Sequence, residues 1–259
     1  MSANTGPEPT NISVTRVALV TGGTAGIGAA IAEALHAAGY RVAVNFGSHA
    51  AAADKFATRT GLPVYSWNVA DFDACADGVA RVQAAMGPID VLVNNAGITR
   101  DMMLHKMTLA QWREVIDTDL GSCFNMCRAV IEGMRERHFG RIINISSVHE
   151  DWPMPGNTPY CLSKGGMRML TRTAGVELAP HNILVVGVGP GAVSTPINSV
   201  TMHDEALLKK LDASIPLGRV AKPEEIANVV AFLASEGASY LTATTVFADG
   251  GIMQSSPGL

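Results

Sequence analysis

The chain has 259 residues, of which 47% are hydrophobic and 16% charged, so it is long enough for one large α/β domain or two small ones with a sizeable core. Its net charge of −4 and its pI near 6.0 argue against nucleic acid and anionic lipid as partners, which bind positively charged surfaces. No apolar run approaches the roughly 18 residues of a membrane span, so we expect no membrane partner.

The N-terminus, MSANTGPEPTNIS, contains Glu8 and lacks the apolar stretch of a secretory signal. We therefore expect a disordered leader over residues 1–13 and a single domain over 14–259. The four cysteines are Cys75, Cys123, Cys127 and Cys161. They form no CxxC pair, and the histidines form no HxxxH pair, so we expect no metal site and predict a reducing, cytoplasmic location.

Short β-rich runs alternate with longer helical segments along the chain. The expected strands are 16–20, 41–45, 64–68, 90–94, 141–146, 183–188 and 244–248. The expected helices are 27–38, 72–86, 108–137, 158–179 and 223–235. The strands are apolar throughout rather than alternating, which is typical of parallel strands covered by helices on both faces. We predict one doubly wound α/β domain with a mostly parallel, Rossmann-type sheet.

Two segments interrupt this alternation. Residues 148–158, VHEDWPMPGNT, are rich in proline and glycine, and residues 190–216 open with Pro190-Gly191. Both follow the carboxyl ends of expected strands, where ligands bind in open α/β sheets. We therefore expect them to be the substrate loops.

A glycine-rich loop, TGGTAGIG, lies between the first expected strand and the first expected helix. Gly22, Gly26 and Gly28 allow the backbone to turn tightly and to approach a pyrophosphate, and the following helix offers free N–H groups. The same motif occurs in ordinary strand-to-helix turns. Its position in the first βαβ unit favours a dinucleotide site.

The choice between NAD(H) and NADP(H) depends on the end of the second strand. NAD sites place an acidic residue there to bind the ribose 2′-hydroxyl. In this chain the segment from Asn45 to His49 has no acid, and the next one is Asp54. No arginine is present to attract a 2′-phosphate, although Ser48 and His49 could donate hydrogen bonds. We favour NADP(H) over NAD(H).

A tyrosine and a lysine, Tyr160 and Lys164, have the four-residue spacing that places both on one helix face. A tyrosine hydroxyl, with an ordinary pKa of about 10, is a poor acid–base group at neutral pH. A nearby ammonium favours the phenolate and makes proton transfer easier. Ser147 lies at the end of the fifth expected strand, where it could hydrogen-bond a substrate oxygen.

These motifs, with Asn94-Asn95-Ala96-Gly97 after the fourth strand and Pro190-Gly191 after the sixth, resemble the short-chain dehydrogenase/reductase family over residues 15–254. The resemblance implies hydride transfer between NAD(P)(H) and a small carbonyl or secondary alcohol. It implies that Tyr160 is the general acid–base, that Lys164 binds the nicotinamide ribose and tunes Tyr160, and that Ser147 orients the carbonyl.

The expected cofactor site combines the glycine loop, the end of the second strand and the positions that this resemblance implies. Besides Tyr160 and Lys164 it comprises Gly22, Thr24, Ala25, Gly26, Ile27, Gly28, Asn45, Ser48, Asn68, Val69, Asn95, Ala96, Gly97, Pro190, Gly191, Val193 and Thr195.

One position departs from the family pattern. The family usually has an asparagine in the helix after the fourth strand, and here Asp119 occupies that position. A carboxylate accepts hydrogen bonds but donates no amide proton. We expect slower turnover or a shifted pH optimum, which Asp119→Asn would reverse.

The two halves of the chain resemble different branches of the family. Residues 16–147 are similar to acetoacetyl-CoA reductases, and residues 147–254 are similar to bacterial glucose 1-dehydrogenases. His149, Glu150 and Asn198 could hydrogen-bond the hydroxyls of a polyol, or His149 and Glu150 could only hold the loop in shape. We predict a sugar or polyol-like alcohol as substrate, with a short 3-oxoacyl thioester, on CoA or acyl carrier protein, as the alternative.

A catalytically silent dinucleotide-binding protein is the alternative of a different class. Asp119 favours it, whereas the presence of Ser147, Tyr160 and Lys164 argues for an enzyme. The resemblance also implies a homotetramer in which the helices 108–137 and 158–179 pair between subunits. Met126, Val130 and Met134 share one face of the first of these, a stripe more typical of the core of one chain.

Overall fold

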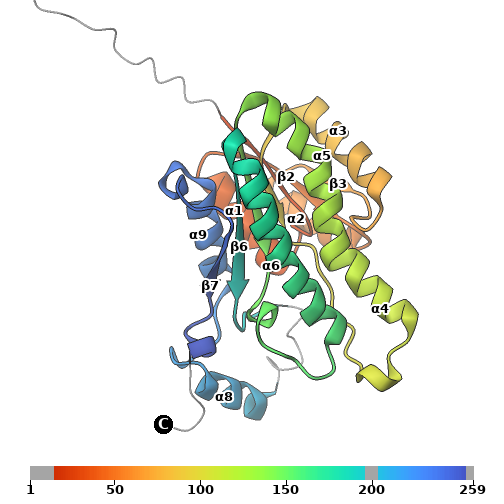
Figure 1. Ribbon diagram of the computed structural model, residues 1–259, viewed down its shortest axis with the longest axis vertical. Coiled ribbons are helices and arrows are strands. Elements are labelled where there is room, and N and C mark those ends of the chain that lie inside the picture. The colour runs from red at the N-terminus through yellow and green to blue at the C-terminus, as the bar shows by residue number, and fades with distance from the viewer. Residues whose placement is uncertain (1–14, 196–203, 255–259) are drawn as a thin grey trace, which may run out of the picture.

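The computed structural model describes residues 15–195 and 204–254 (Figure 1). The expected leader over 1–13 and the expected substrate residue Asn198 lie outside these ranges. Within them, no helix is long and apolar enough to cross a membrane.

Seven strands form one sheet in the order β3-β2-β1-β4-β5-β6-β7, and every neighbouring pair is parallel. The strands are β1 Val17–Val20, β2 Arg41–Phe46, β3 Val64–Ser66, β4 Ile89–Asn94, β5 Gly140–Ile145, β6 Ile183–Pro190 and β7 Thr244–Ala248. The strand order reverses between β1 and β4, and a ligand crevice forms at such a reversal. The predicted doubly wound α/β fold is confirmed.

Helices cover both faces of the sheet. They are α1 Gly26–Ala37, α2 Ala50–Thr60, α3 Phe72–Met86, α4 Leu109–Ile116, α5 Ser122–Arg137, α6 Thr158–Leu178, α8 Glu205–Ser214 and α9 Pro223–Ala234. The helices α1, α2 and α9 contribute to one hydrophobic core, and α3, α5 and the end of α6 contribute to the other. Figure 1 shows α6 crossing in front of β6 and α8 lying beyond the carboxyl end of that strand.

Consecutive residues of the strands enter opposite cores. In β1, Ala18 and Val20 pack in the first core, whereas Val17 and Leu19 pack in the second. This two-sided burial explains why the strand is apolar throughout. The stripe of Met126, Val130 and Met134 on α5 is buried in the second core, so it belongs to the interior of this chain.

Three elements differ from the expectations. The helix α2 was not expected, because its buried face consists of little more than Ala53 and Phe56 and gives a weak periodic pattern. The helix α8 lies inside the segment expected to be a loop, and the carboxylate of Asp204 caps its N-terminus. The expected helix 108–137 is interrupted by one π-helical turn over Asp117–Gly121, which carries the label η2.

Candidate active site

The glycine loop turns tightly and packs closely at the carboxyl end of β1. Gly22 and Gly26 have φ of +60° and +53°, a region that side chains other than glycine rarely adopt. A Cβ on Gly28 would lie 2.4 Å from both the Asn95 side-chain nitrogen and the Gly22 carbonyl oxygen. Ala25 precedes α1 without a side-chain cap, so the first N–H groups of α1 fit a pyrophosphate.

A threonine that the sequence argument did not single out ties this loop to β4. The Thr21 hydroxyl accepts hydrogen bonds from the backbone nitrogens of Asn95, at 3.0 Å, and Ala96, at 3.1 Å. In return, the Asn95 amide donates to the carbonyl oxygens of Thr21 and Gly22. The position of Thr21 directly after the first strand is the sequence feature that could have identified it.

The end of β2, where the adenosine ribose is expected, carries no acidic residue before α2. The Asn45 side chain, an expected cofactor contact, is buried and donates to the Trp67 carbonyl oxygen at 3.0 Å, so it holds β2 against β3. Ser48 is exposed just before α2, and the first turn of α2 contains no acidic residue. No acidic side chain of this segment would therefore repel a phosphate.

The remaining expected cofactor positions lie at the ends of neighbouring strands. Asn68 and Val69 follow β3, and a second overlooked residue, Asn125 of α5, donates to the Val69 carbonyl oxygen at 3.0 Å. Pro190 ends β6, and the Gly191 nitrogen donates to Ala248 of β7. The expected contacts on the glycine loop and after β4 and β6 are thus at one edge of the sheet.

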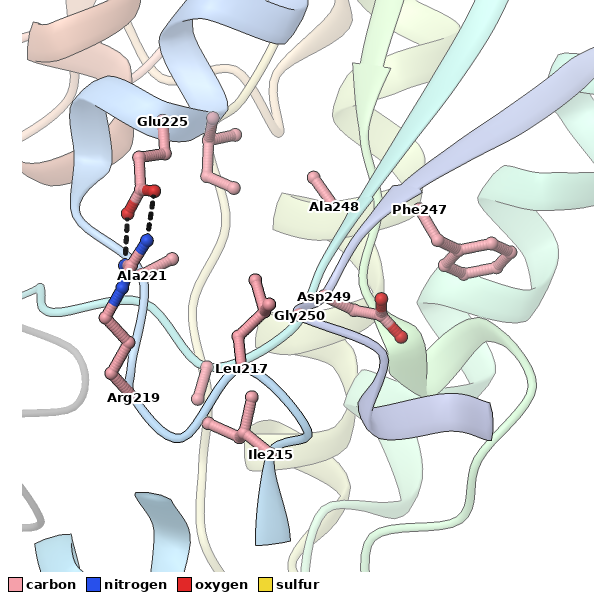
Figure 2. A pocket seen from close by; sticks show the side chains of 11 residues that line it. Ile215, Leu217, Arg219, Ala221, Glu225, Phe247, Ala248, Asp249 and Gly250 are labelled. Atoms are coloured by element: carbon pink, nitrogen blue, oxygen red, sulfur yellow. Dashed lines mark hydrogen bonds and ion pairs between the residues drawn. The ribbon is translucent and has the colours of Figure 1, made fainter. Parts of the chain in front are cut away.

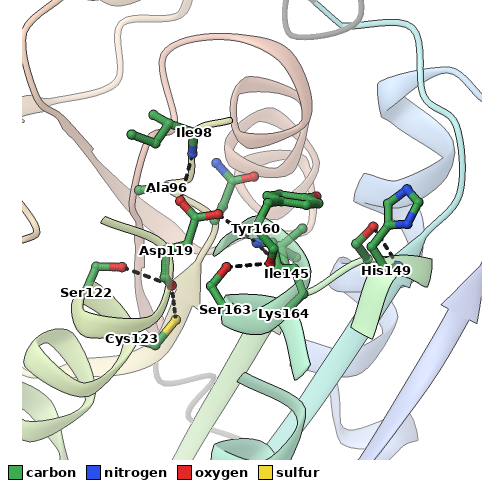
Figure 3. A network of polar contacts seen from close by, with 12 residues as sticks. Ala96, Ile98, Asp119, Ser122, Cys123, Ile145, His149, Tyr160, Ser163 and Lys164 are labelled. Carbon is green, nitrogen blue, oxygen red and sulfur yellow. Dashed lines mark hydrogen bonds and ion pairs between the residues drawn. The ribbon is translucent and has the colours of Figure 1, made fainter. Parts of the chain in front are cut away.

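Tyr160 and Lys164 lie in the first turns of α6, and Figure 3 shows them beside Ile145 and His149, on either side of the position where Ser147 follows β5 in the chain. Ser147 follows β5, is 6% exposed, and its Oγ accepts the His149 N–H at 3.2 Å. The Lys164 Nζ donates to the Ile145 carbonyl oxygen at 3.0 Å and lies 5.4 Å from the centre of the Tyr160 ring. The Ser163 hydroxyl fixes the first turn of α6 by donating to the Tyr160 carbonyl oxygen.

Asp119 lies next to this group, in the π-helical turn η2. It is 0% exposed; its Oδ1 accepts the Ile98 N–H at 2.8 Å, and its Oδ2 lies 3.8 Å from the Lys164 Nζ. Burial raises the pKa of the Asp119 carboxyl, and Lys164 and the Ile98 N–H oppose this only in part. Burial lowers the pKa of the Lys164 ammonium, but Asp119 and Tyr160 outweigh this effect, so that pKa is raised.

Two of the expected substrate contacts, His149 and Glu150, lie in the described residues, and their side chains point in different directions. The His149 ring lies 6.1 Å from the Tyr160 ring, and its Nδ1 is 3.1 Å from the Trp152 carbonyl oxygen, so it borders the catalytic group. The Glu150 carboxylate is turned inward, 3.8 Å from Arg168 and 3.4 Å from the Thr245 hydroxyl. This geometry fits the alternative in which Glu150 holds the loop. Its role in substrate binding stays a prediction.

The loop after β4 joins the loop between Ser147 and Tyr160. The Met102 nitrogen donates to the Gly156 carbonyl oxygen at 2.8 Å. Large apolar side chains are exposed on both loops, namely Met103, Leu104 and Met154. The surface of the two joined loops is therefore apolar at these three positions.

A separate cavity of about 240 Å³ lies behind the turn that follows β6 (Figure 2). Ile215, Leu217 and Phe247 line it, and the ion pair between Arg219 and Glu225 closes one side. None of Ser147, Tyr160 and Lys164 is among its lining residues, so this cavity is separate from the polar contacts of Figure 3. Among the described residues, no group of three or more His, Cys, Asp or Glu side chains could hold a metal ion.

Comparisons with known proteins agree on the type of enzyme. A family model described as enoyl-(acyl carrier protein) reductase matches residues 22–253. The acetoacetyl-CoA reductase of Rhizobium meliloti is 47% identical over 238 residues, covering 92% of this chain and 98% of that protein. That of Paracoccus denitrificans is 48% identical over 231 residues, covering 89% and 95%. A gluconate 5-dehydrogenase from Burkholderia cenocepacia, in complex with NADP and tartrate, has a TM-score of 0.88 at 32% identity and covers 93% of this chain and 96% of that one.

Proposed function

The chain belongs to the short-chain dehydrogenase/reductase family, whose members are NAD(P)-dependent oxidoreductases acting on CH–OH groups, and we propose that it reduces a short 3-oxoacyl thioester such as acetoacetyl-CoA. The observation that carries this proposal is the identity of 46% to 48% to acetoacetyl-CoA reductases over nearly their whole length. The alternative of a silent dinucleotide-binding protein finds no support in these comparisons.

The sugar or polyol substrate that we expected from the sequence has weaker support. The gluconate 5-dehydrogenase that resembles the chain is 32% identical, well below the acetoacetyl-CoA reductases. The contacts of Glu150 with Arg168 and Thr245 support the alternative in which it holds the loop in shape. The apolar side chains on the two joined loops also favour an acyl substrate.

In the proposed reaction, the hydroxyl groups of Ser147 and Tyr160 donate hydrogen bonds to the oxygen of the 3-oxo group. The bound nicotinamide supplies a hydride to the carbonyl carbon. Tyr160 transfers its proton to the oxygen as the carbon–oxygen double bond becomes single. The ammonium of Lys164, 5.4 Å from the Tyr160 ring, stabilises the negative charge that Tyr160 then carries.

We further infer that the preferred coenzyme is NADP(H). The supporting observations are the neutral segment around Ser48, the absence of acid in the first turn of α2, and the NADP bound to the gluconate 5-dehydrogenase. The residues proposed to hold it are those on the glycine loop, after β2, β3, β4 and β6, and Tyr160 and Lys164 on α6.

A homotetramer is the assembly that we propose. Leu162, Met169 and Val176 are spaced by seven residues on α6, and they are 54%, 58% and 69% exposed in the single chain. An apolar stripe of this kind on a long helix is expected to be covered by a second copy.

The test is an initial-rate assay of acetoacetyl-CoA reduction with NADPH and NADH, beside glucose and gluconate oxidation with NADP⁺ and NAD⁺. We expect fast thioester reduction with NADPH and little sugar oxidation. Tyr160→Phe is the control for site-dependent turnover, with an expected loss of at least about 100-fold. Faster oxidation of a sugar than reduction of the thioester would reverse the assignment.

A further inference from the structure

Two opposite charges are buried side by side next to the proposed general acid. The Oδ2 of Asp119 lies 3.8 Å from the Lys164 Nζ, and no described residue offers this oxygen a hydrogen bond. The residue lies in a π-helical turn, a rare element that is frequent at functional sites. Burying such a pair costs free energy, so its presence beside a reacting group calls for a functional explanation.

The surroundings of Asp119 fit an ionised carboxylate. Its Oδ1 accepts the Ile98 N–H, and its Oδ2 faces the Lys164 ammonium at 3.8 Å, an ion-pair distance rather than a hydrogen bond. Lys164, the Ile98 N–H and the Ser163 hydroxyl each lower the pKa of the Asp119 carboxyl, against the rise that burial causes. The ion pair is therefore the form that these contacts satisfy.

We propose that Asp119 is a positioning residue that offsets the charge of Lys164, keeps Tyr160 in its neutral hydroxyl form, and so biases the site toward carbonyl reduction. An isolated ammonium beside Tyr160 would favour the phenolate. The carboxylate on the other side of that ammonium opposes this effect. The result is a tyrosine that retains the proton that reduction consumes.

The two directions of the reaction need opposite forms of Tyr160. In reduction, hydride from the nicotinamide adds to the carbonyl carbon, and the oxygen takes the proton of the Tyr160 hydroxyl. In oxidation, the Tyr160 phenolate accepts the proton of the alcohol while hydride returns to the oxidised nicotinamide. This inference rests on the proposed carbonyl–alcohol chemistry, but it does not depend on which carbonyl is reduced.

The other groups around Lys164 do not provide the same negative charge. Burial raises the pKa of the Cys123 thiol of α5 to about 12, which keeps it neutral. Glu150 also raises the pKa of Lys164, but less than Asp119 does, and Arg168 lies 3.8 Å from its carboxylate. The His149 ring lies 6.1 Å from the Tyr160 ring and carries no negative charge in either protonation state. Asp119 is thus the carboxylate that acts on Tyr160 through Lys164.

The direct test measures the ionisation of Tyr160 without any substrate. The tyrosinate absorbance of each protein is followed against pH, and the same titration of its Tyr160→Phe counterpart is subtracted. We expect Asp119→Asn to lower the midpoint by about one pH unit, the effect of a unit charge several ångströms away. Asparagine keeps an oxygen for the Ile98 N–H, and Asp119→Ser carries the same expectation if the asparagine variant does not fold.

Asp117→Asn is the matched control, because Asp117 lies in the same π-helical turn but is exposed. It should leave the midpoint in place. An unchanged or raised midpoint in Asp119→Asn would overturn the proposal, because Asp119 would then serve only packing.

The kinetic test compares the pH profiles of the two directions with acetoacetyl-CoA and 3-hydroxybutyryl-CoA. In Asp119→Asn, the rise of kcat for oxidation with pH should begin about one unit lower, so that the ratio of kcat for oxidation to kcat for reduction at neutral pH increases about tenfold. An equal loss of rate in both directions, without a shift of the pH–rate profile, contradicts the proposal. If the titration shifts but neither thioester reacts, the proposed substrate is wrong and the role of Asp119 stands.

Discussion

Most polar side chains of the proposed site are held in place by main-chain groups rather than by other side chains. Thr21 and Asn95 bind each other's backbone across β1 and β4, and Lys164 binds the Ile145 carbonyl oxygen. Such bonds fix the geometry before any ligand arrives, which is what catalysis by positioned groups requires. Individual substitutions in this region should therefore change function more than fold.

The coenzyme preference should depend on the charge at Ser48. We expect Ser48→Asp to reduce kcat/KM for NADPH at least about tenfold, because a carboxylate repels the 2′-phosphate, and to leave or improve the value for NADH. Steady-state kinetics with both coenzymes measures this. Ser48→Asn, with the same shape and no charge, is the control. An unaltered NADPH preference in Ser48→Asp would place the 2′-phosphate elsewhere.

The cysteines should differ sharply in reactivity. Burial raises the pKa of Cys123 and Cys127 to about 12 and that of Cys75 to about 11, whereas Cys161 is partly exposed. Because the thiolate is the reactive form, we expect a disulfide reagent at pH 8 to modify at most Cys161 in the folded protein, and all four thiols after denaturation. Rapid modification of a Cys161→Ser variant would contradict this expectation.

The attachment of α6 to the sheet is the main feature at the scale of elements. Asn94 and Asn144 are paired in register at the ends of β4 and β5, and the Asn94 amide donates to the Asn144 side-chain oxygen at 2.8 Å. The Asn144 amide donates in turn to the Thr171 hydroxyl of α6 at 2.9 Å. These two buried hydrogen bonds align the helix that carries Tyr160 and Lys164 with the strand that precedes Ser147.

Breaking these hydrogen bonds should destabilise the protein. Thr171→Val keeps the shape of the side chain but leaves the Asn144 amide without an acceptor, so we expect a loss of about 1–3 kcal/mol in the free energy of unfolding. Denaturant unfolding measures it. Thr173→Val, at an exposed position of the same helix, should change stability by no more than about 0.5 kcal/mol. Equal effects of the two substitutions would mean that the bond to Asn144 contributes nothing.

At the scale of the whole molecule, the exposed stripe of α6 is the clearest indication of assembly. We expect Met169→Glu to convert the proposed tetramer into a smaller species, because a carboxylate buried between subunits is unpaired. Light scattering after gel filtration measures the mass. Ala84→Glu, at an exposed position of α3, is the control. An unchanged mass for Met169→Glu would exclude this face of α6 as a contact between copies.

The sequence by itself was enough to predict the architecture and the catalytic group. Apolar strands buried on both faces, a glycine loop after the first of them, and the Tyr160–Lys164 spacing are local patterns, and parallel topology brings the carboxyl ends of the strands together. The helix α2 was missed for the opposite reason: its few small buried residues give almost no periodicity.

Only the tertiary structure decided what the polar side chains do. Asn45 and Glu150 are ordinary polar residues in the sequence, and the fold turns both inward, toward Trp67 and Arg168. In the sequence, Asp119 is only a residue that differs from the asparagine usual in the family. The π-helical turn places it beside Lys164. These outcomes depend on contacts between residues far apart in sequence, which local periodicity does not encode. The sequence therefore determined the sheet and pointed to the groups that we propose carry the chemistry, and the packing of helices on the sheet determined which charges face them.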